Sequence, residues 1–495
     1  MAGRPTLVRA DWVIAQADQP ALRKAAILIR DGVIAAIGPA RDISAPEDAE
    51  LVALGAAVVV PGLVNAHQHG RGISQILMGY PDMALEPWIA ARRKHGAPDI
   101  HAVTRLAAEA MLAHGVTATL HANYTYATGD YAQELAAQIA GYRDAGLRAT
   151  VCVGLQDRGH VVYPDADEAA FIAALPQPAR SLFNRAATPP YMPDWAASHA
   201  LMDRLQAACD GDDLIRLAWG PAGPQWVSDH LWRAIAVDAG KRNIGVHFHV
   251  LESPAQAHAA THLYPGGTLA HLRALGVFEG PASCAHAVHM TEADMRIAAD
   301  EGLVVVLNPG SNMRLFNGPP PVASLRDAGV RLALGTDNCA LNDDEDLLAE
   351  LRLAAALGRV GGIGSGRADA RDMLRIATQN GAEAIFRPDQ VGLLAPGRPA
   401  DLAAFALDGS GGATELGFDM LNEQLVARGR PCILTMVAGH IRFANRPEDH
   451  ARLHNAQGAA MESVIARAHL ADDAQIAGLQ NALQAHYARR RAQVR

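Results

Sequence analysis

The sequence predicts an α/β protein with a (β/α)₈ barrel at its centre and a small β-domain assembled from both ends of the chain. Three observations predict this fold. Eight apolar stretches of strand length alternate with helical stretches through the middle of the chain. Histidines and an aspartate follow several of these stretches, and short alternating segments flank them on both sides. A doubly wound sheet would show a similar local texture, but the chain length and the residues at the strand ends favour the barrel.

The small β-domain is expected in two parts. Residues 1–60 contain short alternating segments, and Asp31-Gly32 between two of them is a strong hairpin signal. The second part is expected at residues 389–445, because β texture returns at 391–405, 432–437 and 440–443. We expect these parts to form one discontinuous β-sandwich domain.

The barrel is expected over residues 61–388. Several predicted helices end at a glycine directly before the next strand, as at Gly115 and Gly146, and glycine just past a helix C-terminus is the usual cap. The eight predicted strands are residues 58–64, 118–122, 149–154, 215–219, 244–250, 282–288, 303–307 and 330–334.

Residues 446–495 are predicted to form a helical extension. An apolar stripe at helical spacing precedes the basic run Arg489-Arg490-Arg491. One interpretation is a contact between copies of the chain, in line with the homo-oligomer that we expect. The other is a helix packed on its own barrel with a solvated basic end. The stripe consists of Ile476, Leu479, Leu483 and Tyr487.

Composition excludes several classes of function. Of the 495 residues, 50% are hydrophobic and 19% are charged, and the net charge is -9, as is ordinary for a globular protein. This balance gives no reason to expect nucleic acid or a membrane as a partner. The five cysteines are far apart and form no Cys-x-x-Cys pair, and residues 1–13 lack the apolar region of a signal peptide. We therefore expect a cytoplasmic protein that acts on a small molecule.

His67 and His69 stand at the end of the first predicted barrel strand. Successive side chains of a strand point to opposite faces, so these two imidazoles share a face and could bind one metal ion. An isolated His-x-His is more often structural. However, further metal-ligand or proton-transfer residues follow later strands, and the carboxyl ends of barrel strands lie together. These residues are His121, His247, His249, Glu252, His286 and Asp337.

An ordered series of motifs runs through the chain. These motifs are Pro61-Gly62-Leu63-Val64-Asn65-Ala66-His67-Gln68-His69, His249-Val250-Leu251-Glu252, Ala285-His286-Ala287-Val288, Asn308-Pro309-Gly310-Ser311-Asn312 and Leu334-Gly335-Thr336-Asp337. The series resembles the amidohydrolase superfamily, in particular its branch of cytosine, guanine and adenosylhomocysteine deaminases and s-triazine hydrolases. The resemblance implies a distorted (β/α)₈ barrel that holds one divalent ion and activates water for attack at a C–N or C–X bond.

The resemblance also implies roles for particular residues. His67 and His69 match the ligands of the first strand, and Asp337 matches the ligand of the eighth. Strand alternation alone leaves His247 and His249 equivalent, but the His-x-x-Glu spacing to Glu252 selects His249 as the third histidine ligand. His286 matches the histidine that neighbours the attacking water in this branch.

The chemistry needs these residue types. Three imidazoles and a carboxylate leave one coordination position open for a water molecule, whose pKa can fall to about 7 on a metal ion. Asp337 can take a proton from that water, and Glu252 can pass a proton to a ring nitrogen or leaving group. His286 can hold the attacking water or polarise the group under attack.

The absence of a lysine indicates how many metal ions the site holds. Binuclear relatives carry a carboxylated lysine on the fourth strand, whereas no lysine lies between Lys94 and Lys241. We therefore expect one ion, Zn²⁺ first and Fe²⁺ as the alternative.

The chain departs from the branch at several positions. Ala222 stands where the branch often has histidine, so it cannot hydrogen bond a substrate. Asn338 follows Asp337 where glycine or serine is commoner, and it could donate to a substrate. His121 could contact substrate or support the site from behind, and Gln156 is a further candidate contact. The remaining loop residues that could shape an apolar pocket, or simply pack loop to barrel, are Met78, Tyr80, Trp226 and Phe316.

We predict a mononuclear metal hydrolase that deaminates an N-heterocyclic substrate. Hydrolysis of an amide, urea, carbamate or triazine substituent at the same site is the alternative. A catalytically silent ligand-binding barrel is a remote third, because such proteins tend to lose ligands or the proton shuttle and this chain keeps them all.

Overall fold

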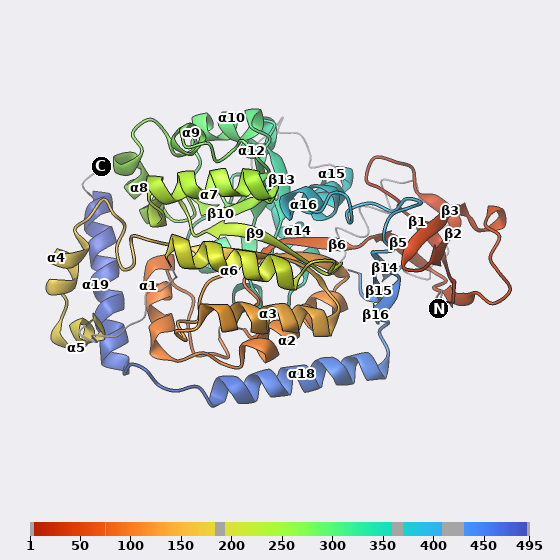
Figure 1. Cartoon of the computed structure of the whole chain (residues 1–495), viewed down its shortest axis with the longest axis horizontal. Helices are drawn as coiled ribbons and strands as arrows, with labels where there is room; N and C mark the ends of the chain where they lie inside the picture. The colour runs from red at the N-terminus through yellow and green to blue at the C-terminus, as the bar shows by residue number, and fades with distance from the viewer. Residues whose placement is uncertain (1–3, 75, 184–193, 359–369, 408–429, 493–495) are drawn as a thin grey trace.

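The computed structural model describes residues 4–74, 76–183, 194–358, 370–407 and 430–492 (Figure 1). Eight parallel strands, hydrogen bonded in chain order, form the predicted barrel. The first and last of them meet where Gln68 bridges to Asp337, and the Asp337 amide donates to His67 O at 3.0 Å. The barrel strands are β6 (Leu63–Gln68), β7 (Val116–His121), β8 (Arg148–Leu155), β9 (Ile215–Pro221), β10 (Val246–Val250), β11 (Ala282–His286), β12 (Val304–Leu307) and β13 (Arg331–Leu334).

Helices follow the barrel strands and cover them, and a large apolar cluster packs between the two layers. This layer holds large side chains such as Trp219, Trp232 and Phe248. The helices are α1 (Leu85–Ala91), α2 (Ile100–Ala113), α3 (Tyr131–Ala145), α4 (Glu168–Ala173), α5 (Gln177–Arg180), α6 (Trp195–Ala208), α7 (Asp229–Arg242), α8 (Pro254–Leu263), α9 (Thr268–Ala274), α10 (Glu292–Asp300), α11 (Pro309–Arg314), α12 (Val322–Asp327), α13 (Cys339–Asn342), α14 (Leu347–Leu357), α15 (Ala370–Ala377), α16 (Gln379–Ala384), α18 (Pro447–Ile465) and α19 (Asp473–Ala492).

The stretch predicted as a single strand at 58–64 is two strands. β5 (Ala57–Pro61) belongs to the small sheet and β6 begins at Leu63 in the barrel, with Gly62 between them. A Cβ atom on Gly62 would lie 2.0 Å from the Thr117 hydroxyl oxygen of β7, so only glycine allows this approach. The prediction was wrong here because apolar residues continue on both sides of Pro61-Gly62 and were assigned to one strand, although the chain changes sheet at this break.

The predicted β-domain from both ends of the chain is confirmed. Its strands are hydrogen bonded in one mixed sheet, in which β5 pairs antiparallel with β14 and so joins the two ends. The sheet lies at one end of the long axis of the molecule (Figure 1). Its order is β16 (His440–Phe443), β15 (Cys432–Val437), β14 (Leu402–Ala406), β5, β1 (Thr6–Val13), β2 (Leu22–Arg30) and β3 (Val33–Pro39), with β4 (Glu50–Ala53) beside β1.

The C-terminal extension is helical, as predicted. Helix α18 packs along α2, and α19 packs against α1 and α5 at the end of the molecule opposite the small sheet (Figure 1). The predicted apolar stripe of α19, from Ile476 to Tyr487, is buried within this chain. The structure therefore shows the second interpretation, a helix packed on its own barrel, and the homo-oligomer stays a prediction.

None of the helices in the described ranges is long and apolar enough to cross a membrane.

Candidate metal centre

A bulge in strand β6 turns the side chain of His67 toward the inside of the barrel. The pairing advances three residues on β6, from Asn65 to Gln68, while it advances two on β7. An extra residue in one strand redirects the side chains beyond it. Asn65 Nδ2 faces the covering helices, 3.4 Å from Met111 Sδ, whereas the ring of His67 lies 4.9 Å from the ring of His249 on β10.

A chain of hydrogen bonds determines which nitrogen of His67 carries the proton. The Ser283 hydroxyl donates to Ala384 O at 2.8 Å, since a carbonyl oxygen can only accept. Ser283 Oγ therefore accepts from His247 Nδ1 at 2.7 Å, and His247 Nε2 accepts from His67 Nδ1 at 2.8 Å. His67 Nε2 keeps its lone pair, and this buried atom has no hydrogen-bond partner among the described residues.

His69 and His249 present the same edge. Nδ1 of His69 lies 2.5 Å from Ala122 O, and Nδ1 of His249 lies 2.8 Å from Ala222 O. Both Nδ1 atoms must donate to these carbonyls, so both Nε2 atoms keep a lone pair. This arrangement, with a backbone or side-chain acceptor behind each ring, is typical of metal-ligating histidines.

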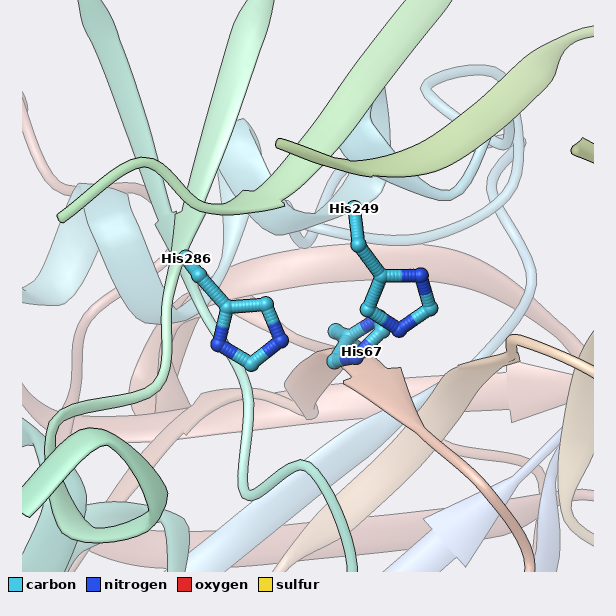
Figure 2. A group of neighbouring side chains, drawn as sticks. All are labelled: His67, His249 and His286. Carbon is cyan, nitrogen blue, oxygen red and sulfur yellow. The ribbon is translucent and has the colours of Figure 1, made fainter. Parts of the chain in front are cut away.

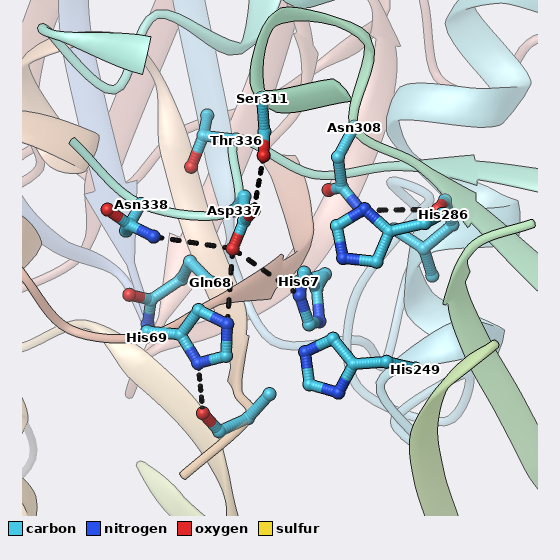
Figure 3. Close-up of polar contacts among 12 residues, drawn as sticks. His67, Gln68, His69, His249, His286, Asn308, Ser311, Thr336, Asp337 and Asn338 are labelled. Atoms are coloured by element: carbon cyan, nitrogen blue, oxygen red, sulfur yellow. Dashed lines mark hydrogen bonds and ion pairs between the residues drawn. The ribbon is translucent and has the colours of Figure 1, made fainter. Parts of the chain in front are cut away.

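Asp337 lies at the end of β13 and faces these nitrogens. Its Oδ1 is 3.1 Å from His69 Nε2 and 3.7 Å from His67 Nε2, and its Oδ2 accepts from the Ser311 hydroxyl at 2.5 Å (Figure 3). Asp337 has a φ of +65°, a left-handed conformation that costs on the order of 1 kcal/mol for a residue with a Cβ. The hydrogen bond to Ser311 holds the carboxylate in this orientation.

His286 and Glu252 lie on the other side of the centre. Alternation along β11 would turn His286 outward with Cys284, which packs beneath the helices. A φ of +75° at His286 breaks the alternation, and its ring lies 5.4 Å from that of His67. His286 Nδ1 bonds Asn312 Oδ1 at 2.9 Å, and its Nε2 is 3.8 Å from Glu252 Oε2.

Burial keeps the histidines neutral. It lowers the pKa of His67 and of His247 well below the ordinary value of 6.5, and the neighbouring rings lower them further. It lowers the pKa of His249 to about 3. Neutral imidazole is the form that binds a metal ion, so the cluster is ready for one at pH 7.

The pKa values of the two carboxyl groups shift in opposite directions. Burial raises the pKa of Glu252 well above its ordinary value, and the charges of Asp337 and Glu86 raise it further. Burial alone would raise the pKa of Asp337 too, but the imidazoles of His67 and His69 outweigh it and hold that pKa well below the usual range. Carboxyls whose environments separate their pKa values are suited to different proton-transfer roles.

The structure brings the predicted metal-site residues to one centre as two overlapping triads that share His67. One triad is His67, His249 and His286 (Figure 2), and the other is His67, His69 and Asp337 (Figure 3). Within each triad the possible ligand atoms lie within 4.8 Å of one another. Four of these residues are the predicted ligand set, and His286 lies close enough to be grouped with them.

One cavity lies at the centre, and a second cavity shares four lining residues with it. A cavity of about 50 Å³ is lined by the cluster itself together with Ala222, Trp226 and Asn338. A second cavity, of about 930 Å³, is lined by Gln156 and by further loop residues. Asn338 lines the smaller cavity and Gln156 the larger one, and their contact with a substrate stays a prediction.

His121 faces neither of these two cavities. It is fully buried and bonds the hydroxyl of Tyr142, on the covering helix α3, at 2.8 Å. Of its two predicted alternatives, the placement matches support from behind the site. Among the loop aromatic and apolar residues, Met78 and Tyr80 line the larger cavity, whereas Phe316 is 63% exposed.

The roles of several residues at the site were not found from the sequence. His247 supports His67 from below, and only the tertiary contact with Ser283 reveals this. Asn312 orients His286, and its place in the Asn308–Asn312 motif was the available signal. Arg71 and Arg92 line both cavities, and no sequence signal marks either of them. Arg71 lies in the loop after β6, and Arg92 begins the short 3-10 helix Arg92–Lys94 that follows α1.

Comparison with known proteins identifies a family and several relatives that this chain resembles. Residues 58–442 match the profile of the amidohydrolase family. A 5-methylthioadenosine/S-adenosylhomocysteine deaminase from Nitratidesulfovibrio vulgaris strain Miyazaki F is 29% identical over 453 residues, which span 88% of this chain and 92% of the relative.

Two solved structures share the fold. An adenosine deaminase from Xanthomonas campestris with bound zinc has a TM-score of 0.75 at 25% identity, over 92% of this chain and 98% of its own. Atrazine chlorohydrolase TrzN from Arthrobacter aurescens TC1, complexed with zinc, has a TM-score of 0.72 at 26% identity, over 92% of this chain and 100% of its own.

Proposed function

This chain belongs to the amidohydrolase family, hydrolases that act on carbon–nitrogen bonds, and we propose that it deaminates an N-heterocyclic amine with the help of one divalent metal ion. The observation that carries the proposal is the convergence of unprotonated ligand atoms on one point. His67, His69 and His249 each commit Nδ1 to an acceptor, which leaves a lone pair on each Nε2. Nε2 of His67 and of His69 faces the carboxylate of Asp337, and His249 lies in the triad that shares His67.

These residues fit a metal ion. Lone pairs of Nε2 atoms and a carboxylate oxygen face one another at distances such as the 3.1 Å between His69 and Asp337, with no proton to bridge them. A cation would relieve this repulsion, and three imidazoles with one carboxylate are a ligand set that Zn²⁺ prefers. Zinc is bound in both related structures. Strand β9 carries no lysine, which supports a single ion.

When bound, the ion would supply Lewis acidity that lowers the pKa of a water molecule in the small cavity. Side chains of the protein would then accept and donate the protons of the reaction. Asp337 lines that cavity and its Oδ2 accepts from the Ser311 hydroxyl, so Oδ1, which faces His67 and His69, is the atom that would take a proton from the water. His286 directs Nδ1 to Asn312, so its Nε2 accepts a hydrogen bond from the attacking water.

Glu252 is placed to protonate the substrate. Its raised pKa, caused first by burial, favours the protonated carboxyl, and Asn317 Nδ2 holds Oε1 at 3.0 Å. Oε2 is therefore the atom that we assign to protonate a ring nitrogen. The proton that Asp337 takes from the water would then pass to the departing amine, and the remaining proton of the added hydroxyl would return to Glu252. The product of such a reaction is ammonia.

A second reaction is favoured by one specific observation. The atrazine chlorohydrolase resembles this chain as closely as the adenosine deaminase does. Ala222, which lines the small cavity, also cannot hydrogen bond a nucleoside. Hydrolysis of a triazine, amide, urea or carbamate substituent at the same centre is therefore the alternative proposal.

A substrate panel separates these reactions. The full chain, reconstituted with Zn²⁺, would be incubated with adenine and guanine derivatives, aminopyrimidines, chlorotriazines, ureas and amides. Release of ammonia from an amino heterocycle supports the proposal. Release of chloride or of a larger amine without ammonia would favour the alternative, and no turnover on any member would favour the silent barrel.

A further inference from the structure

Two cavities meet at a narrow junction beside the candidate metal centre. Four residues line both of them: Arg71, Ile89, Arg92 and Tyr124. The cavity at the centre measures about 50 Å³, which is room for an ion and a water molecule, since a water occupies roughly 30 Å³ in the liquid. A heterocyclic ring therefore has to extend through the junction toward the cavity of about 930 Å³.

The junction carries positive charge without a matching carboxylate. Neither Arg71 nor Arg92 forms an ion pair with any acidic group in the described ranges. Arg71 Nη2 is buried and has no hydrogen-bond partner there. A guanidinium group stays charged in proteins, so both arginines bring a positive charge to the junction.

Both guanidinium groups are held by aromatic faces instead. Arg71 lies over the ring of Tyr126, 4.4 Å from its centroid, and Arg92 lies over Tyr124 at 4.6 Å. Stacking on a ring fixes the plane of a guanidinium and leaves its N–H groups free at the edge. This is the geometry in which arginine binds planar or tetrahedral anions.

Other buried arginines show what a structural role looks like. Arg148 makes two hydrogen bonds to Asp401, and Arg387 donates to backbone carbonyls, a hydroxyl and an amide oxygen. Leaving a buried charged donor unpaired is costly, and such groups normally find a partner in the protein. Arg71 and Arg92 thus keep capacity for a partner that arrives from outside.

We propose that the substrate carries an anionic group, a carboxylate or a phosphate, that binds between Arg71 and Arg92 while its amino-bearing ring faces the metal centre. This inference rests on the proposed function and defines its substrate class as acidic N-heterocyclic amines. Arg71 follows His69 by two residues, so the segment that supplies a predicted metal ligand also supplies the anion contact and sets the distance between them.

Binding of matched probes to the zinc-loaded full chain tests this by calorimetry. The first series is adenosine, adenosine 5′-monophosphate and adenosine 5′-carboxylate, and the second is pterin and pterin-6-carboxylate. We expect an anionic member of at least one series to bind roughly 10- to 100-fold more tightly than its neutral parent, as for hydrogen bonds between charged groups. The phosphate and carboxylate arms of the first series identify which anion the junction prefers.

Variants at the junction test whether Arg71 and Arg92 cause the preference for anionic probes. Arg71→Met or Arg92→Met should remove most of it without changing the affinity for the neutral parent by more than about threefold. Arg71→Lys should retain part of it, because the charge remains while the planar fork is lost. Arg30→Met, at an exposed position on β2 of the small sheet, is the matched control for loss of one charge and should keep the full preference.

The outcomes distinguish this inference from the proposed function. Equal affinity for neutral and anionic members, no binding of any anionic member, or a preference that survives both Met variants would overturn the anion site even if heterocyclic amines are deaminated. An anion preference that depends on Arg71, in a protein that releases no ammonia from any amine, would support the anion site and count against deamination.

Discussion

The two ends of the barrel bury polar groups in opposite ways. At the end beneath the strands, Arg148 pairs with Asp401 through two hydrogen bonds, and all the N–H groups of Arg387 have acceptors. At the end where the strands finish, His67 Nε2 and Asn338 Oδ1 are buried without a partner among the described residues.

This difference separates a structural network from a binding site. An unpaired buried polar atom costs about 1–3 kcal/mol, so a protein keeps such atoms only where something else compensates. The lower network joins strand β8 to Asp401, beside β14 of the small sheet, and needs nothing further. At the upper end, the unpaired buried atoms need a ligand to compensate them. Two residues of the same cluster, His286 and Asp337, also have left-handed backbone conformations.

The largest expected effect is at the upper end. Glu252→Gln keeps the shape of the side chain but removes the carboxyl that carries a proton, so turnover should fall about 10²- to 10⁴-fold. Zinc content and thermal stability should stay close to those of the wild type, because Glu252 is not in either candidate metal triad. Steady-state kinetics alongside metal analysis would check this, and a variant with full activity would remove Glu252 from the mechanism.

At the lower end, breaking the buried pair should affect stability instead. Asp401→Ala leaves Arg148 buried without its carboxylate, and we expect the free energy of unfolding to fall by about 3–5 kcal/mol in urea denaturation. The double variant Arg148→Met/Asp401→Leu should recover most of that loss, since no unpaired charge remains. A loss in Asp401→Ala below about 1 kcal/mol would contradict the structural assignment of this network.

A smaller effect is expected at His247, which connects the buried hydroxyl of Ser283 to the candidate ligand His67. His247→Phe removes the acceptor for His67 Nδ1, so zinc affinity should drop about 10- to 100-fold in a competition assay with a chelator. His247→Gln is the matched control, because an amide oxygen can still accept from His67 and should preserve most of the affinity. Equal affinities in all three proteins would show that His247 does not orient His67.

The stability of the metal-free chain should also depend on pH. His67, His247 and His249 have folded pKa values below 6.5, so the unfolded chain binds more protons below that pH. Their contribution to stability is fully present above pH 6.5 and is lost as the pH falls toward the folded values, by about 1.4 kcal/mol per histidine per pH unit.

Thermal melts at pH 7.5, 6.5 and 5.5 would measure this loss. His247→Phe removes one of the three groups and should show a shallower fall over the same range. A melting temperature of the metal-free wild type that rises on acidification would contradict neutral burial of these rings.

Much of the barrel could be predicted because its signals are local. Apolar strands and glycine helix caps placed seven of the eight strands to within two residues, and the predicted first strand spanned β5 and only the start of β6. The residues that follow these strands marked His67, His249 and Asp337. Alternation also predicted that His67 and His69 share a face. The bulge that turns this face into the barrel, and the positive φ that turns His286 inward, depend on tertiary packing and left no pattern in the sequence.

The rest of the site depends on contacts between distant segments. His247 and His249 look alike along β10, and only the hydrogen bonds of His247 to Ser283 and His67 show that it lies one layer deeper. Likewise, His121 follows a barrel strand as the other histidines do, but it packs against Tyr142 on the covering helix. Residue type and strand end therefore identify candidates, and the direction of each side chain decides among them.

The stoichiometry of zinc in the full chain tests the central claim most directly. After removal of metals with a chelator and dialysis against Zn²⁺, elemental analysis should find about one ion per chain in the wild type, and His67→Ala should lose it. Binding of about two ions per chain, or of none, would contradict a single metal centre built on His67, His69, His249 and Asp337.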